Sequence, residues 1–267
     1  MTDKIKSLRE KTGAGMVDCK KALDESAGDL EKAVEILRKK GIAKASKRED
    51  REANEGVVKV DIDKEKNKAY ILEINSETDF VSRSGKFKDF TEEVFSLIKS
   101  GEPKNLDELM EIKMSDGNSV KDNLNNLSGV IGEKLGVKRF NIIASAGTVA
   151  AYSHSGGRIG AIVSLDKREM DDLAYEMAMQ IAAANPKYIN REQVPEADLA
   201  KEKEIYREQL IKEGKPEQMI EKILPGKMNK YFEEICLVDQ EFIKDDKKKI
   251  RDVLGDAGIE SLVRYSL

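Results

Sequence analysis

The sequence has no tryptophan, a single histidine and only two cysteines among its 267 residues. One histidine excludes metal sites built from several imidazoles, and a Ser-His-Asp triad would have to use His154. Cys19 and Cys236 lie far apart in the sequence, without the C-x-x-C spacing of a redox or zinc site. We interpret both thiols as small core residues in a reducing compartment.

Long apolar runs and an excess of one charge are also missing. No stretch of 18 apolar residues is present, and the start M-T-D-K-I-K lacks the apolar run of a signal peptide, so we expect a cytoplasmic protein without a membrane span. The 47 Lys and Arg nearly balance the 51 Asp and Glu, which argues against a nucleic-acid binder with one basic face. The apolar content of 39% is enough for a core in one large domain or in two to three small ones.

Motifs for nucleotide or metal chemistry are absent from the sequence. No G-x-x-x-x-G-K-[ST] loop occurs, and the acidic turn after Asp61 has Lys66 and Leu72 where a calcium loop needs Gly and Glu. We therefore expect no cofactor, no metal and no enzymatic reaction. His154 stands in S-H-S-G-G, which predicts an exposed hairpin turn whose special role would be a contact with a partner.

The first forty residues predict three short helices. Apolar residues recur at helical spacing around Leu8, around Cys19 and from Leu30 to Leu37, with Asp29 placed to cap the third helix. Each pattern stops at a glycine, as expected at a helix C-terminus: Gly13, Gly28 and Gly41. The run from Ala43 to Glu55 has no apolar residue larger than Ala and predicts a charged linker or helix. Residues 1–54 are thus expected to form a three-helix docking module with its linker.

The rest of the chain predicts an α+β fold. Alternation from Val58 to Ile62 and in A-Y-I-L-E-I-N predicts a hairpin, and two amphipathic helices follow. The order of hairpin and then helix recurs from T-V-A-A-Y onward, which indicates two related core subdomains at residues 55–139 and 140–267. Between Pro186 and Pro225, two helical patterns of about three turns each flank a G-K-P turn. They predict an inserted helical hairpin at residues 187–225.

Two segments match a known family. L-R-E-K-T-G-A-G-M-V-D-C-K-K-A-L runs from Leu8 to Leu23, and E-I-N-S-E-T-D-F-V-S-R runs from Glu73 to Arg83. Both closely resemble the signature segments of bacterial elongation factor Ts, in that family's order and spacing. The resemblance implies a factor that promotes GDP release from elongation factor Tu without chemistry of its own, and an N-terminal module that is ubiquitin-associated-like. Relatives continue beyond V-R-Y-S-L into a further helical segment, whose contacts we do not expect here.

The resemblance also implies roles for particular residues. Thr78, Asp79, Phe80 and Val81 would enter the GTPase domain of the partner near its nucleotide and Mg²⁺, with Phe80 as a wedge between helices and Asp79 making polar contacts. Spacing alone leaves a second interpretation open, in which Phe80 is a core residue that plugs the end of the hairpin. Further contacts implied by the resemblance are Arg9, Met16, Val17, Lys20, Ile131, Gly132 and His154.

Two other functions stay open at this point. The three-helix module could be a peptide-binding adaptor of the ubiquitin-associated type. For the proposed contacts of the module, the alternatives are ordinary helix packing for Met16 and a solvated helix face for Arg9 and Lys20. A ribosome-associated or RNA-binding protein would use the basic residues Lys44, Lys47, Arg48 and Arg51. The oligomeric state is also open, a homodimer included.

Overall fold

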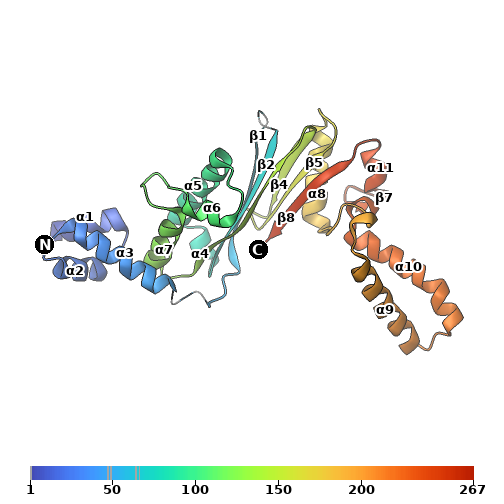
Figure 1. Ribbon diagram of the computed structural model, residues 1–267, viewed down its shortest axis with the longest axis horizontal. Helices are drawn as coiled ribbons and strands as arrows, with labels where there is room; N and C mark the ends of the chain where they lie inside the picture. The colour runs from blue at the N-terminus through green and yellow to red at the C-terminus, as the bar shows by residue number, and fades with distance from the viewer. Residues whose placement is uncertain (1, 47, 49, 64, 66) are drawn as a thin grey trace. The chain divides into compact units, whose positions relative to one another are not determined.

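The computed structural model describes residues 2–46, 48, 50–63, 65 and 67–267. Helices and strands are mixed along the chain (Figure 1), which confirms the expected α+β class. The chain divides into two compact units. Unit 1 contains the described residues up to Lys59, with Leu72–Asn141 and Leu267, and unit 2 contains those of Val60–Ile71 and Ile142–Ser266. The domain boundaries expected at residues 54 and 139 stay predictions.

Unit 1 begins with three helices, which are α1 (Thr2–Thr12), α2 (Met16–Glu25) and α3 (Leu30–Ser46). Gly13 and Gly28 have φ angles of 66° and 82°, the left-handed conformation expected beyond a helix end. Oδ1 of Asp29 accepts hydrogen bonds from the N–H groups of Glu31 and Lys32 at 3.0 and 3.1 Å, so Asp29 caps α3 as expected. The helices enclose a small core of Leu8, Ala14, Cys19, Ala22, Leu23, Ala33 and Leu37.

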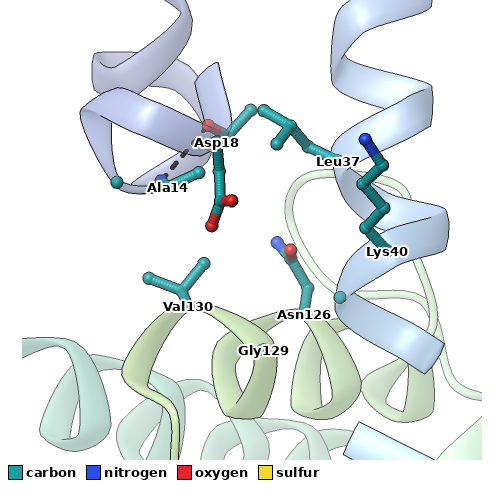
Figure 2. A pocket seen from close by; sticks show the side chains of 10 residues that line it. Ala14, Asp18, Leu37, Lys40, Asn126, Gly129 and Val130 are labelled. Carbon is teal, nitrogen blue, oxygen red and sulfur yellow. Dashed lines mark hydrogen bonds between the residues drawn. The ribbon is translucent and has the colours of Figure 1, made fainter. Parts of the chain in front are cut away.

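The expected end of the third helix at Gly41 is wrong, because α3 continues to Ser46. The reason is tertiary. A Cβ atom on Gly129 of α7 (Val120–Ile131) would lie 2.7 Å from the Cα of Gly41, so the two glycines let α3 and α7 approach closely. Arg38 forms an ion pair with Asp122 along the same contact. Beside it lies a cavity of about 40 Å³, lined by side chains of the N-terminal helices and α7 (Figure 2).

The remaining elements of unit 1 frame the candidate site. They are α4 (Asp79–Ser82), α5 (Gly85–Gly101), α6 (Leu106–Glu111) and α7. The expected apolar face of α5 is buried through Phe87, Phe90, Val94 and Ile98, which confirms the helical periodicity. A three-stranded sheet has the order β1-β2-β3, and its strands are β1 (Glu55–Asp63), β2 (Lys68–Ser76) and β3 (Leu135–Ala144).

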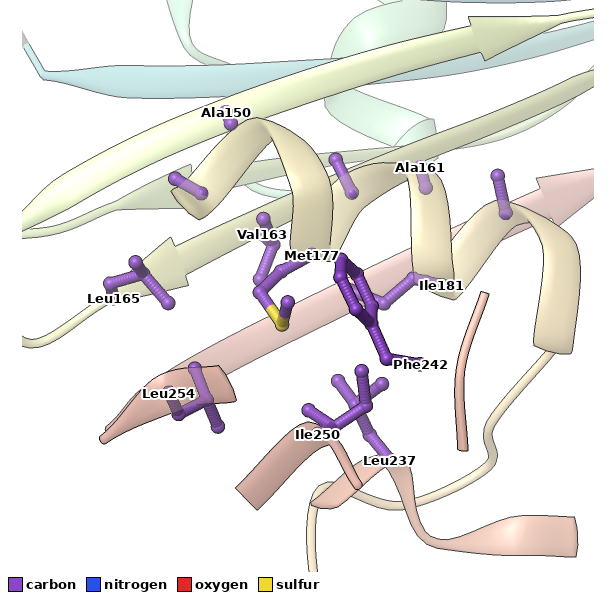
Figure 3. Close-up of a cluster of buried hydrophobic side chains, with 13 residues drawn as sticks. Ala150, Ala161, Val163, Leu165, Met177, Ile181, Leu237, Phe242, Ile250 and Leu254 are labelled. Atoms are coloured by element: carbon purple, nitrogen blue, oxygen red, sulfur yellow. The ribbon is translucent and has the colours of Figure 1, made fainter. Parts of the chain in front are cut away.

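Unit 2 is built on an antiparallel sheet of order β4-β5-β8, with strands β4 (Thr148–His154), β5 (Ile159–Leu165) and β8 (Ile259–Ser266). The hairpin of β4 and β5 is followed by α8 (Asp171–Ala184), as the sequence predicts. Met177 and Ile181 of α8 pack with Val163 of β5 and with Phe242 and Leu237 in one apolar cluster (Figure 3). Shorter elements complete the unit: Arg191–Gln193, Leu237–Asp239, β6 (Glu241–Phe242), β7 (Asp245–Lys249) and α11 (Ile250–Leu254).

The helical hairpin is present, but it is longer than expected. Its helices are α9 (Glu196–Lys212) and α10 (Glu217–Ile235), which lie side by side in Figure 1. Pro225 lies inside α10, so the predicted end of the hairpin at this residue is wrong. A proline in a helix interior costs about 3 kcal/mol. Burial of Ile220 and Leu224 just before the proline, and of Ile235 after it, offsets that cost through packing.

Candidate functional site

The signature segment from Glu73 to Arg83 includes the end of β2, a tight turn and α4. Thr78 is the N-cap of the four-residue helix α4, and its Oγ1 accepts the N–H of Val81 at 3.4 Å. Ser84 then caps α5, while its hydroxyl donates to the carbonyl oxygen of Val81 at 2.8 Å. Two consecutive caps therefore fix the backbone on both sides of Phe80.

The Phe80 side chain points into solvent. Its exposed fraction is 82%, the highest among the large apolar side chains that the structure describes as exposed, whereas Phe87 in the next helix is 0% exposed. The core interpretation of Phe80 is therefore wrong. The exposed ring is available for a contact with another molecule.

Asp79 and Val81 flank this ring on α4. The carboxylate of Asp79 pairs with Arg83 at 3.0 Å, one helical turn further on; Arg83 is exposed, whereas Asp79 is half-buried. Val81 is half-buried. The four residues of the predicted Thr-Asp-Phe-Val segment therefore differ: Thr78, Asp79 and Val81 are half-buried, and only Phe80 is exposed.

A pair of carboxylates anchors the turn to the loop after α7. Glu133 accepts two hydrogen bonds from Thr78, one from the backbone N–H at 3.0 Å and one from Oγ1 at 2.8 Å. In return, Glu77 accepts the backbone N–H of Lys134 at 2.5 Å. We call these three contacts the Glu77/Glu133 clamp. Because charge-assisted hydrogen bonds are about twice as strong as neutral ones, the clamp holds the turn firmly.

The clamp extends to the chain segment that follows α3. Arg51 pairs with Glu77 at 3.2 Å, and the ammonium of Lys134 donates to the carbonyl of Arg51 at 2.8 Å. The N–H of Lys134, together with Arg51, holds the pKa of the Glu77 carboxyl below its usual value. Glu77 therefore remains ionised, as the clamp requires, at neutral pH.

Ile131 and Gly132 lie immediately before the clamp. Ile131 is the last residue of α7, and Gly132 follows it with φ of 90°, a left-handed C-cap that suits glycine. The hydroxyl of Ser128 donates to the carbonyl of Glu133 at 2.6 Å and fixes this loop against the helix. The structure thus brings the predicted residues 131–132 and 78–81 together through Glu133.

Four further predicted contacts lie on the three-helix module. Met16 and Val17 occupy the first turn of α2 and are 62% and 66% exposed, so the alternative of ordinary helix packing is wrong for Met16. Arg9 and Lys20 are exposed, as the sequence predicts for a charged helix face. All four side chains are therefore accessible for contacts with another molecule.

His154 belongs to unit 2, where it is the last residue of β4 and is exposed, as expected. Its Nδ1 lies 3.0 Å from the hydroxyl of Tyr152. The Tyr152 ring in turn packs edge-on against Tyr175 of α8, with the ring centroids 5.7 Å apart. The chain's only histidine therefore stands in a small aromatic group on the surface of unit 2.

Glu77, Glu133, Tyr152 and Tyr175 were not among the predicted site residues. Glu133 directly follows Gly132 in V-I-G-E-K, so its neighbourhood was singled out, but no local pattern links it with Thr78, 55 residues earlier. The two cysteines are free and buried, which confirms their interpretation as core residues. Within the described part of the chain, no helix is long and apolar enough to span a membrane, and no group of three or more His, Cys, Asp or Glu could hold a metal ion.

These observations define an α+β protein whose candidate site is an exposed aromatic residue on a clamped surface turn. The comparisons with known proteins identify the family. The family model described as Elongation factor TS matches residues 77–267. The Elongation factor Ts of Chlorobium phaeobacteroides (strain BS1) is 44% identical, in an alignment that covers 98% of this chain and 96% of that protein. The chain belongs to the elongation factor Ts family and is a translation elongation factor.

Proposed function

We propose that the chain is the guanine-nucleotide exchange factor of elongation factor Tu and acts in the cytoplasm. The observation that carries this proposal is the 82% exposed Phe80 on its clamped turn, within a chain of the elongation factor Ts family. A GTPase holds its nucleotide chiefly through the phosphates and Mg²⁺. A rigid ring that enters the GTPase domain displaces the elements around that site, and GDP then dissociates.

The proposed mechanism is one of binding. If the factor binds nucleotide-free elongation factor Tu more tightly than the GDP complex, then GDP must weaken the binding of the factor by the same ratio. Exchange is therefore reversible, and it requires neither a catalytic residue nor a cofactor. In this mechanism Phe80 is the wedge, Thr78 and Val81 shape the turn that carries it, and Asp79 supplies a polar contact beside the ring.

The other predicted residues provide separate docking points. We infer that Met16 and Val17 form the apolar centre of a contact made by the module, with Arg9 and Lys20 at its rim, because burial of these exposed apolar side chains in a complex is favourable. Ile131 and Gly132 lie next to the Phe80 turn and would contact the same partner surface. His154 would make a further contact from unit 2.

The structure weakens the RNA-binding alternative. The guanidinium of Arg48 donates to the carbonyl of Ser128 at 3.3 Å, and Arg51 pairs with Glu77. Both arginines are thus engaged within the protein. Lys47 lies outside the described residues, and the side chain of Lys44 is not described either. The adaptor alternative is favoured by the exposure of Met16 and Val17, and it predicts binding of a peptide by residues 1–54 alone.

The test is release of fluorescently labelled GDP from elongation factor Tu. The chain at a tenth of the concentration of elongation factor Tu should accelerate release through many turnovers, because the factor is regenerated after each exchange. An unchanged release rate at micromolar chain would remove the proposal. Raising the salt concentration separates the RNA-binding alternative, because a complex with nucleic acid weakens steeply with salt whereas an apolar wedge contact does not.

A further inference from the structure

The turn that carries Phe80 cannot be held by its own helix. The four residues of α4 form about one helical turn, and a helix this short is unstable in water because nucleation is unfavourable. The Phe80 ring adds little, since most of its surface is in solvent. The conformation of the turn must therefore be imposed by contacts with other parts of unit 1.

The contacts that can do this come from one side chain more than from any other. Both carboxylate oxygens of Glu133 are used, with Oε2 accepting the N–H of Thr78 and Oε1 accepting its hydroxyl. The same hydroxyl accepts the N–H of Val81, so the Glu133 carboxylate sets the orientation of the N-cap group. Glu133 thus holds Thr78, two residues before Phe80, and acts through the Thr78 hydroxyl on Val81, the residue after Phe80.

We propose that Glu133 is a positioning residue that orders the Phe80 turn before the partner binds. The role in exchange rests on the proposed function, whereas the ordering of the turn does not. A ligand surface that is already in its bound conformation avoids the entropy loss of ordering on association. If only a fraction of the molecules has the competent turn, the apparent dissociation constant rises by the inverse of that fraction.

Three variants test this role. In Glu133→Gln, one of the two acceptor oxygens is replaced by an amide group that donates, so Thr78 loses one acceptor while the side-chain volume is kept. Thr78→Val removes the hydroxyl and keeps the backbone N–H. Glu111→Gln makes the same chemical change at an exposed carboxylate at the end of α6 and is the matched control.

The first measurement is amide hydrogen exchange by NMR on the free protein. Glu133→Gln should raise the exchange rate of the Thr78 and Val81 amides, which donate to Glu133 and to the Thr78 hydroxyl, about tenfold, the ratio that corresponds to 1.4 kcal/mol. Amides of α5 and of the three-helix module should be unaffected, and Glu111→Gln should match the wild-type protein throughout. Unchanged exchange at Thr78 and Val81 in Glu133→Gln would overturn the proposal.

The second measurement is the GDP-release assay at increasing concentrations of each variant. Glu133→Gln and Thr78→Val should raise the half-saturating concentration about tenfold, with a maximal rate close to that of wild type, because the saturated complex still contains the wedge. Phe80→Ala should instead lower the maximal rate. A merely structural role for Glu133 would lower the stability against urea and leave the half-saturating concentration per folded molecule unchanged, and that result would reject the positioning role.

The two measurements also distinguish failure of the exchange-factor proposal from failure of the positioning role. If the wild-type chain does not accelerate GDP release, the exchange-factor proposal fails, and amide exchange alone then decides whether Glu133 orders the turn. If the wild-type chain is active but Glu133→Gln has the same half-saturating concentration as Glu111→Gln, the exchange-factor proposal stands and the positioning role is rejected.

Discussion

Replacing Phe80 by Ala should separate function from stability in this protein. The ring is 82% exposed, so only about a fifth of its surface is covered in the folded chain. Full burial of a Phe side chain contributes about 1.5–3 kcal/mol, and the covered fifth therefore corresponds to about 0.3–0.6 kcal/mol. Alanine also has the higher helix propensity in α4, which offsets part of this loss. We expect the free energy of unfolding to change by less than about 1 kcal/mol.

Phe87→Ala is the matched control. Phe87 stands seven residues later, in α5 of the same unit, and it is completely buried. Its truncation leaves a cavity and should cost about 3–5 kcal/mol. Urea unfolding of both variants and of the wild-type protein measures these differences directly. Phe80→Ala should lose little stability and Phe87→Ala much more, because the first ring is exposed and the second is buried.

The functional half of the prediction uses labelled GDP release from elongation factor Tu, well below the unfolding transition of each variant. Phe80→Ala should lower the maximal rate of exchange by at least about tenfold, because the wedge is removed while the rest of the contact surface remains. Phe87→Ala should retain its rate per folded molecule. A Phe80→Ala protein that exchanges nucleotide normally, or that loses more than about 2 kcal/mol of stability, would refute the reasoning.

Further outcomes can be checked with the same methods. Met16→Ala combined with Val17→Ala should leave the free energy of unfolding within about 1 kcal/mol of wild type, because both side chains are mostly exposed. The double variant should raise the half-saturating concentration in the GDP-release assay. A half-saturating concentration equal to that of wild type would place the module's contact elsewhere. The folded protein holds the pKa of Glu77 below its usual 4.5, so the ionised carboxylate stabilises the fold above that pH. The difference in unfolding free energy between wild type and Glu77→Gln should therefore be present at pH 7 and vanish as the pH falls through the folded pKa. A difference that does not depend on pH would contradict this assignment. Replacing residues 204–228 by a short Gly/Ser loop should leave cooperative unfolding intact. The apolar cluster at the base of the hairpin, with Val194, Ile235 and Cys236, lies outside the replaced segment. Loss of cooperative unfolding would show that the whole hairpin is part of the core.

Local structure was largely predictable from the sequence. The alternation around Val58, the buried face of α5 and the Asp29 cap depend on neighbours within a few residues, and periodicity or capping chemistry reports such contacts directly. The extension of α3 beyond Gly41 and the passage of α10 through Pro225 were missed. In both places packing against another helix outweighed the intrinsic preference of a single residue.

The family follows from the amino-acid sequence alone, through two long signature segments, and so do the residue types available at the candidate site. The exposure of Phe80 became clear from the folded structure alone, because one ring among polar neighbours has no periodicity that would assign it to a face. The same holds for the clamp. Thr78 follows the end of β2 and Glu133 follows the end of α7, and the two residues hydrogen-bond although they are far apart in the sequence. The fold brings them together, so no local sequence pattern could predict these contacts.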